Sequence, residues 1–344
     1  MRVTLSDVAK QAGVGLSTAS RALNRSGYVS EQLRKRVLQA AIALDYYPDM
    51  LAQQLASDRR RTITLFEVGN YGNVQSSQDL EWFFGPLHKA LGRDIAEAGY
   101  ELNIALQRSD EGHPAQVLAR IRRSHGSAAI VLFIRSPLDA RLVDELAQID
   151  VPMVSINCPL ERLGIPAINS DIRGAALKAT QHLIDGGYSR IAHMQGPAHL
   201  PATELRIIGY EEAMAAAKMT PMMVEGDFDP DTGYSAMHKL LDVEQKPNAV
   251  FCANDSAAIG ASRAIQERGL SVPDDIALVG FDDIPVSRFL FPSLSTVRQP
   301  QQRMGEATAR AILDCLAGQT PPKELLIPCE LIVRESSVPR PILS

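Results

Sequence analysis

The sequence predicts an α/β protein made of a short helical segment at the N-terminus and a longer body of doubly wound parallel sheets. Three observations support this prediction. Apolar residues within 1–48 recur with helical spacing between capping residues. From residue 62 onward, apolar strand-like runs alternate with amphipathic helices, an order typical of parallel sheets. The first 61 residues hold ten basic and five acidic side chains, whereas the remainder holds 25 and 35.

The first predicted helix spans residues 5–12. Thr4 precedes it, and Asp7 follows Thr4 at the spacing of a capping box. Gly13 predicts the end of this helix, because glycine readily adopts the left-handed conformation of a helix C-cap. Its apolar face comprises Leu5, Val8, Ala9 and Ala12.

A second predicted helix, residues 16–24, begins only a few residues after the first. Its inner side is apolar, and Ser17, Ser20 and Arg21 lie on its outer side. Two short helices joined by a tight turn that contains glycine are typical of a helix-turn-helix, whose second helix reads the DNA major groove. The net positive charge of this segment agrees with a polyanionic partner, although so short a segment can acquire such a charge by chance. A third helix is predicted from about Ser30 to Leu44, with a core stripe of Leu33, Val37, Leu38, Ala41 and Leu44.

The body contains strand-like runs separated by helices. The predicted strands are residues 62–68, 100–105, 128–134, 153–156, 190–194, 249–252 and 277–280. A long helix is predicted over residues 77–98, between the first two strands. The body contains more strands and helices than pack around one compact core, so we expect two similar lobes.

Several protein classes are disfavoured by what the sequence lacks. The four cysteines lie far apart without a CxxC pair, so neither a zinc knuckle nor a redox motif is predicted. There is no signal-peptide apolar segment at the start, and no uninterrupted apolar run of about 18 residues. No GxSxG, HExxH or Walker A motif occurs, nor a GxGxxG after the first strand. We therefore expect no catalytic site, no metal, no cofactor, no membrane contact and a cytoplasmic location.

The N-terminal segment resembles the LacI/GalR family of bacterial repressors. The matching blocks follow in order at family spacing: residues 3–9 (VTLSDVA), 12–14 (AGV), 17–24 (STASRALN), 29–30 (VS), 47–48 (YP) and 52–56 (AQQLA). The resemblance implies a DNA interface made by Thr4, Leu16, Ser17, Thr18, Ser20, Arg21, Asn24, Ser30, Ala52 and Leu55.

Two of these residues have a specific implied role. Arg21 suits a guanine, whose N7 and O6 accept a bidentate guanidinium; the alternative is a phosphate contact alone. Residues 49–57 resemble the family's hinge helix, in which a leucine, here Leu55, wedges into the minor groove of a bent operator. The alternative is that Leu55 packs against the body.

The body resembles the periplasmic-binding-protein-like core of the same repressors over essentially its whole length. The blocks include residues 186–192 (GGYSRIA), 251–260 (FCANDSAAIG), 279–283 (VGFDD) and 296–300 (TVRQP). The resemblance implies a helix-turn-helix domain in residues 1–48, a hinge helix and linker in 49–61, and a two-lobed ligand-binding core in 62–344. The N-lobe is expected in about 62–157 and 293–324, and the C-lobe in about 158–292 and 325–340, with crossings near residues 158, 293 and 325.

The resemblance also implies a ligand in the cleft between the lobes, at the carboxyl ends of the strands. The implied ligand-binding residues are Arg135, Asn157, Arg206, Phe228, Asn254, Asp282 and Gln299. Their chemistry suits a sugar, because a carboxylate can accept two hydroxyls while arginine and amides donate. The alternatives are a core position for Phe228 and a structural ion pair between Asp282 and Arg206.

Arg135 bears on the charge of the ligand. Two buried arginines opposite one carboxylate are costly unless the ligand is anionic, which favours an acidic sugar. The alternative is that Arg135 points to solvent or pairs with Asp139. The segment 69–79 is longer and more polar than the family usually has, so Trp82 can serve the ligand, an interface or the core.

The expected function is therefore a sequence-specific repressor that binds an operator as a homodimer and responds to a sugar-like effector. A dimer presents two recognition helices to two half-sites, and closure of the lobes on an effector changes the spacing of the hinge helices. A receptor of the periplasmic-binding-protein type without a regulatory role is the alternative, disfavoured by the DNA-binding segment and the missing signal peptide.

Overall fold

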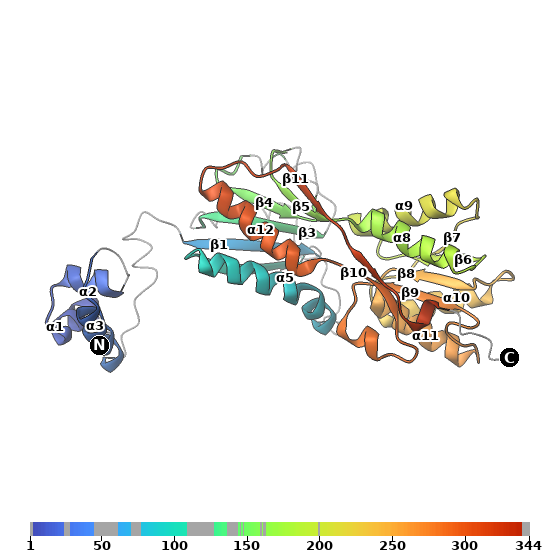
Figure 1. Cartoon of the computed structure of the whole chain (residues 1–344), viewed down its shortest axis with the longest axis horizontal. Helices are drawn as coiled ribbons and strands as arrows, with labels where there is room; N and C mark the ends of the chain where they lie inside the picture. Colours follow the sequence, from blue (N-terminus) through green and yellow to red (C-terminus); the bar gives the residue numbers. More distant parts are fainter. Residues whose placement is uncertain are drawn as a thin grey trace. The chain divides into compact units, whose positions relative to one another are not determined.

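The structure, a computed structural model, describes most of the chain in two compact units, Met1–Arg60 and Arg61–Ser344 (Figure 1). It describes residues 3–23, 28–44, 61–69, 77–108, 127–135, 144, 146, 148–158, 160, 163–198 and 200–338. For residues 42, 69, 77–83, 107, 108 and 135 it describes the backbone alone. The predicted hinge helix, with Ala52 and Leu55, lies outside the described residues, as does Asn24.

The N-terminal unit contains three described helices, α1 (Leu5–Ala12), α2 (Leu16–Leu23) and α3 (Glu31–Ala43). The predicted capping box of α1 is confirmed, because Thr4 Oγ1 accepts a hydrogen bond from the Asp7 amide and the Asp7 carboxylate accepts one from the Thr4 amide. Gly13 ends this helix at φ +61°, as predicted. The three helices enclose a small core of Val8, Ala9, Ala12, Ala19, Ala22, Val37, Ala40 and Ala41.

One predicted core position of α3 is wrong. Leu38 is 43% exposed, and Ala40 is buried in its place. At about 100° per residue, Ala40 and Ala41 lie on either side of Val37 around the helix, whereas Leu38 points beyond Ala41 and away from the core. The buried face of α3 follows Val37, Ala40 and Ala41 instead.

The first lobe of the body is built on a six-stranded, all-parallel sheet with the order β11-β5-β4-β3-β1-β2. Its strands are β1 (Thr62–Gly69), β2 (Glu101–Arg108), β3 (Ala129–Arg135), β4 (Met153–Ile156), β5 (Ala167–Ser170) and β11 (Glu324–Ile327). The helices α5 (Ser77–Glu97) and α12 (Gln301–Leu316) lie side by side over one face (Figure 1). Alternate strand residues such as Ile63, Leu65 and Val131 fill the core beneath them.

The second lobe repeats this plan with the order β12-β10-β9-β8-β6-β7. Its strands are β6 (Ile191–Met194), β7 (Met222–Val224), β8 (Ala249–Cys252), β9 (Ala277–Phe281), β10 (Ser295–Arg298) and β12 (Glu330–Ile332), of which β12 runs antiparallel to β10. Its helices are α8 (Ile172–Asp185), α9 (Pro201–Ala216), α10 (Pro230–Asp242) and α11 (Asp255–Glu267), with 3-10 turns η3 (Pro285–Phe289) and η4 (Glu335–Ser337). The pair α8 and α9 packs on one face and the pair α10 and α11 on the other.

The predicted boundaries between the lobes are wrong in all three places. The strand 167–170 was expected in the C-lobe segment 158–292 but joins the first sheet, and 295–298 was expected in the N-lobe segment 293–324 but joins the second. Most of β11 was also assigned to the wrong lobe, 325–340. The chain therefore crosses after β5, after β10 and after β11. These strands are four residues long and were missed in the sequence, and the crossings that the resemblance implied near residues 158, 293 and 325 all come too early in the chain.

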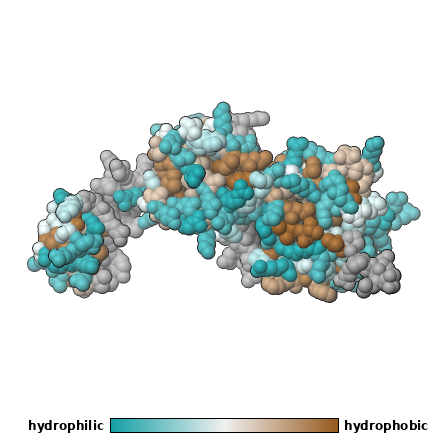
Figure 2. Space-filling view, in the orientation of Figure 1, coloured by the Kyte–Doolittle hydropathy of each residue, from teal (hydrophilic) through white to brown (hydrophobic). Residues whose placement is uncertain are grey.

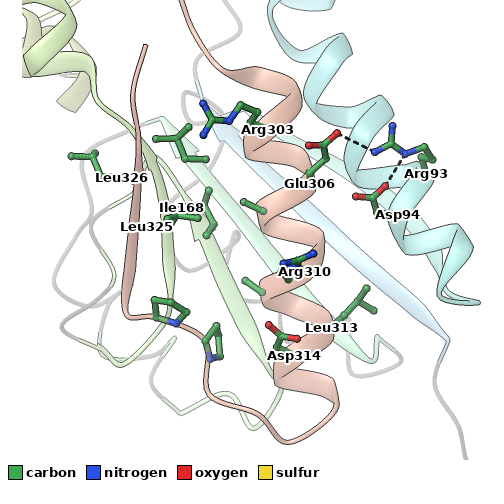
Figure 3. A pocket seen from close by; sticks show the side chains of 15 residues that line it. Arg93, Asp94, Ile168, Arg303, Glu306, Arg310, Leu313, Asp314, Leu325 and Leu326 are labelled. Carbon is green, nitrogen blue, oxygen red and sulfur yellow. Dashed lines mark hydrogen bonds and ion pairs between the residues drawn. The ribbon is translucent and has the colours of Figure 1, made fainter. Parts of the chain in front are cut away.

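A groove of about 730 Å³ lies on the first lobe between α12 and the edge strand β11. Figure 3 shows Arg303, Arg310 and Asp314 along α12 and the two leucines of β11, while Arg93 of α5 pairs with Glu306. No predicted ligand-binding residue with a described side chain lines this groove. In Figure 2, hydrophobic residues also gather in patches on the visible faces of both lobes. Among the described helices, none is long and apolar enough to cross a membrane.

Candidate nucleic-acid interface and ligand cleft

The outer face of α2 carries the residues predicted to contact DNA. Leu16 is 54% exposed, Ser17 and Arg21 are exposed, and Thr18 and Ser20 are half-buried. The opposite face is closed, because Ala19 and Ala22 are buried against α1 and α3. The helix therefore presents hydroxyls, one leucine and one guanidinium outward, a set that can contact base edges and phosphates.

Two further predicted DNA contacts lie at helix starts. Ser30 is exposed immediately before α3. The Thr4 hydroxyl lies 2.6 Å from a carboxylate oxygen of Asp7, so it is already engaged in the cap of α1. A phosphate contact by Thr4 would therefore have to share this hydroxyl with the cap.

In the body, Arg206 of α9 is the most deeply placed of the predicted ligand residues, at 3% exposure. Its guanidinium lies 4.1 Å from the ring centre of Phe281 and 5.4 Å from that of Phe228. Nη1 donates to the Ala202 carbonyl at 3.3 Å, and Nη2 is 4.0 Å from Asp282 Oδ1. Burial lowers the pKa of Arg206, and the Asp282 carboxylate opposes this shift. At 4.0 Å the Arg206–Asp282 contact is longer than a hydrogen bond.

Asp282 and Gln299 meet at the carboxyl ends of the second lobe's strands. Asp282 follows β9 with φ +110°, and its Oδ1 accepts a 2.7 Å hydrogen bond from Gln299 Nε2. Gln299 follows β10, at the second crossing, and is 5% exposed. The amide of Gln299 therefore occupies one of the carboxylate oxygens that a ligand hydroxyl would use.

Asn157 and Gln299 are joined through Ser170, the last residue of β5. Asn157 Oδ1 accepts from the Ser170 amide at 2.8 Å, and the Ser170 hydroxyl lies 3.2 Å from both Asn157 Oδ1 and Gln299 Oε1. A hydroxyl has one proton to donate. The Ser170 amide already donates to Asn157 Oδ1. When the Ser170 hydroxyl donates to Gln299 Oε1, both side-chain oxygens therefore have a donor. This orients the Gln299 NH₂ group toward Asp282 and links the two lobes.

Phe228 and Asn254 line the same region from the second lobe. Phe228 is half-buried, and its ring fills the space beside Gly196, where an added Cβ would stand 2.5 Å from the ring. Asn254 caps α11 by accepting from the Ala257 amide at 2.8 Å, and its Nδ2 donates to the Phe228 carbonyl at 3.0 Å. Asn254 thus has one side-chain N–H left to donate to a ligand. Its other N–H positions the backbone of Phe228.

Arg206 Nε and Thr203 Oγ1 are buried polar atoms with no hydrogen-bond partner among the described residues. Unpaired buried donors are costly, so they favour a ligand or water that supplies acceptors. The backbone of Arg135 ends β3 opposite Gly69, and its side chain lies outside the described part of the chain. Within the described ranges, no group of three or more His, Cys, Asp or Glu is placed to hold a metal ion.

Two family profiles match the chain. Residues 4–49 match the bacterial regulatory proteins of the lacI family, and residues 180–337 match the periplasmic-binding-protein-like domain. The probable repressor ExuR of Bacillus subtilis is 31% identical, with 97% of this chain and 98% of that protein aligned. The regulator CelR of Thermobifida fusca is 34% identical at the same coverage. This chain belongs to the LacI family.

Solved structures of LacI-family proteins agree with both units. The Lac repressor dimer bound to operator and the anti-inducer ONPF is 26% identical, covers 98% of this chain and all of its own, and gives a TM-score of 0.84. A complex of CelR with cellobiose is 33% identical, covers 97% of this chain and all of its own, and gives 0.71. The predicted fold class, a helix-turn-helix unit followed by two parallel-sheet lobes, is confirmed.

Sequence reasoning did not identify three residues that shape the cleft of this LacI-family chain. Ser170 was missed because β5 was not recognised as a strand, so its last residue was not seen as a strand end. Phe281 stood in the matching block 279–283 without an assigned role, although the Arg206 guanidinium lies over its ring. Thr203 stands one helical turn before Arg206 on α9, a spacing that could have suggested a shared face.

Proposed function

We propose that this protein is a transcriptional repressor that binds a DNA operator as a homodimer and whose operator affinity is set by a sugar or sugar derivative. Bacterial transcription takes place in the cytoplasm, and we assign the protein there without enzymatic activity. The observation that carries the proposal is the pairing, in one chain, of an outward-facing α2 with a polar cleft that joins Arg206, Asp282 and Gln299. Relatives along nearly the whole chain are regulators of transcription.

The cleft supports a polyhydroxylated ligand. Asp282 offers carboxylate oxygens, Arg206 offers a buried Nε donor without a partner among the described residues, and the rings of Phe228 and Phe281 provide apolar faces. A sugar presents hydroxyls in its ring plane and C–H groups on its faces, which these groups complement. CelR, which is similar in fold, has been solved with cellobiose.

An exposed apolar surface on the second lobe supports the homodimer. Phe289 is 75% exposed and Phe291 is 83% exposed, on either side of Leu290. A shallow depression beside them is lined by Ile259, Ser262, Arg263, Gln266, Glu267, Leu290 and Phe291. Two exposed aromatic side chains this close together mark a protein interface. The structurally similar Lac repressor was solved as a dimer.

Within the same proposal, we favour an acidic effector, such as a uronate or a sugar phosphate. Arg135 closes β3 at the carboxyl edge of the first sheet, the edge at which Asn157 and Ser170 also lie. Two arginines would then face the single carboxylate of Asp282, and a ligand anion would balance them. Isothermal calorimetry with D-glucose and D-glucuronate separates the possibilities. Tight binding of the neutral sugar, unchanged in Arg135→Ala, would refute the acidic effector and leave the repressor assignment standing.

The main test is a band shift on the promoter region beside this gene, with and without sugars that raise the melting temperature in a thermal-shift panel. We expect specific binding that one class of sugar changes. Asp282→Ala should bind the same DNA without responding to that sugar, and a thermal melt must show the body still folded. Sugar binding without any specific DNA binding would instead support the receptor function.

A further inference from the structure

The turn that carries Asp282 is held in an unusual backbone conformation. Asp282 has φ +110° and Asp283 has φ +52°, and neither residue is glycine. Aspartate adopts the left-handed region near φ +52° more readily than most residues, but φ +110° is unusual for a non-glycine residue and persists where the surroundings determine it. Three backbone contacts contribute. The Asp282 amide donates to the Val297 carbonyl at 2.7 Å, the Asp283 amide to Thr296 Oγ1 at 3.3 Å and the Ile284 amide to Asp255 Oδ2 at 2.9 Å.

The side chain of Asp283 is bound on both carboxylate oxygens. Oδ1 accepts from Arg334 Nη2 at 2.6 Å, and Oδ2 accepts from Arg298 Nε at 2.7 Å. The two arginines differ in their surroundings. The Arg334 side chain is 16% exposed and also donates from Nη1 to the Leu294 carbonyl at 2.7 Å, whereas Arg298 is 50% exposed. Arg334 is therefore the more ordered partner.

Asp282 and Asp283 are adjacent in one turn, and the carboxylate of either residue can turn toward the cleft. A guanidinium that holds Asp283 away from the cleft decides which one faces the ligand. Arg334 can do this from a distant part of the chain, beyond the third crossing and after β12. Its own backbone is fixed as well, since the Arg334 amide donates to Ser295 Oγ at 2.7 Å.

We propose that Arg334 is a positioning residue of the effector site: by binding Asp283 it keeps the left-handed turn and aims the Asp282 carboxylate at the ligand. The inference rests on the proposed role of Asp282 in effector binding. Arg334 does not touch the ligand, so its loss changes affinity only through residues 282 and 283. Breaking a well-ordered charged hydrogen bond should weaken binding roughly tenfold.

The first experiment measures calorimetric affinity for D-glucose, D-glucuronate and cellobiose. We expect Arg334→Met to weaken the binding of whichever probe the wild type binds, roughly tenfold. Arg334→Lys, which keeps the charge, should recover part of the loss. Arg173→Met is the matched control, because it removes the exposed ion pair between Arg173 of α8 and Glu212 of α9 and should leave affinity unchanged.

A double-mutant cycle separates positioning from general destabilisation. Glycine adopts the left-handed conformation without help, so in Asp283→Gly the turn no longer depends on Arg334. Adding Arg334→Met to Asp283→Gly should then change affinity less than about twofold. A further tenfold loss in that background, or no loss from Arg334→Met alone, would overturn the proposal.

Hydrogen exchange measured by mass spectrometry tests the turn without any ligand. Arg334→Met should speed exchange of the amides of Asp282 and Ile284 while leaving a peptide from α8 unchanged. If the wild type binds none of the three sugars, this exchange result alone decides the positioning role. Unchanged exchange in residues 282–284 would reject it.

Discussion

A buried histidine in the second lobe makes the stability of the body depend on pH. His193, on β6, is fully buried and stacks on Phe251 with ring centres 4.9 Å apart. Its Nδ1 lies 3.0 Å from the Phe251 carbonyl oxygen and must carry a proton to donate there, while Nε2 has no hydrogen-bond partner among the described residues. Burial lowers the pKa of His193 from 6.5 to about 4, and nearby Arg206 adds to the effect.

The direction of the change in the free energy of unfolding depends on which state, folded or unfolded, binds the proton more readily. Below pH 6.5 the unfolded chain protonates this imidazole, while the folded protein leaves it neutral until about pH 4. The unfolded state therefore binds more protons in this window, and the free energy of unfolding falls as the pH is lowered from 6.5 to 4. One pKa unit corresponds to about 1.4 kcal/mol, so the loss attributable to His193 reaches about 2 kcal/mol at pH 5 and about 3 kcal/mol at pH 4.

The perturbation is His193→Leu, which replaces the imidazole with an apolar side chain of similar size and so removes its titration. The assay is urea unfolding at pH 7 and pH 5 for both proteins. The lost hydrogen bond to Phe251 does not depend on pH, so it cancels when the two pH values are compared within each protein. Burial raises the pKa of Asp255 to about 8, which gives the opposite slope, but this residue is present in both proteins and also cancels.

We expect the wild type to lose about 2 kcal/mol more than His193→Leu between pH 7 and pH 5. Equal losses in the two proteins would mean that His193 is either hydrated or already protonated in the folded state. That result would refute the reasoning from burial.

Further predictions concern DNA binding, assembly and packing. Arg21→Ala should weaken specific operator binding by about 1–3 kcal/mol and relax preference at one base pair of each half-site, which band shifts on operator variants will show. Leu55→Ala should bind the operator more weakly and bend it less in a circular-permutation band shift; wild-type bending would reject the wedge. Phe291→Ser should shift the protein toward monomer in analytical ultracentrifugation, and an unchanged dimer would place the interface elsewhere. The Tyr210 hydroxyl accepts from the Met222 amide and donates to the Ile191 carbonyl, both at 2.8 Å. Tyr210→Phe should therefore lower the free energy of unfolding by about 1–3 kcal/mol in urea, and no change would mean that water replaces the hydroxyl.

The sequence predicts best the elements whose signals are local. The capping box of Thr4 and Asp7 and the glycine stop at Gly13 depend on neighbours within four residues, and both are present. The long apolar runs of β1, β3 and β8 were also predicted within a residue or two of their bounds. These elements are stabilised by their own pattern, so a single sequence is enough to find them.

The short strands at the crossings were missed for a physical reason. Strand β11 carries exposed residues at three of its four positions, and β5 and β10 each contain polar residues. Their strand state comes from pairing with neighbours already in a sheet, such as Ile168 with Leu325, which lie far apart in sequence. A pattern read along the chain does not contain that information.

The same limit applies to the cleft. Family resemblance located Asn157, Asp282 and Gln299, but the contact that relates them passes through Ser170, which lies 129 residues from Gln299. Because the chain crosses directly after β5 and after β10, Ser170 and Gln299 lie where the chain passes from one lobe to the other. A change in the angle between the lobes must therefore alter the Ser170–Gln299 contact or the Gln299–Asp282 contact. Under the proposed function, a ligand hydroxyl that replaced Gln299 on Asp282 would act on this same chain of hydrogen bonds, which would couple effector binding to lobe movement.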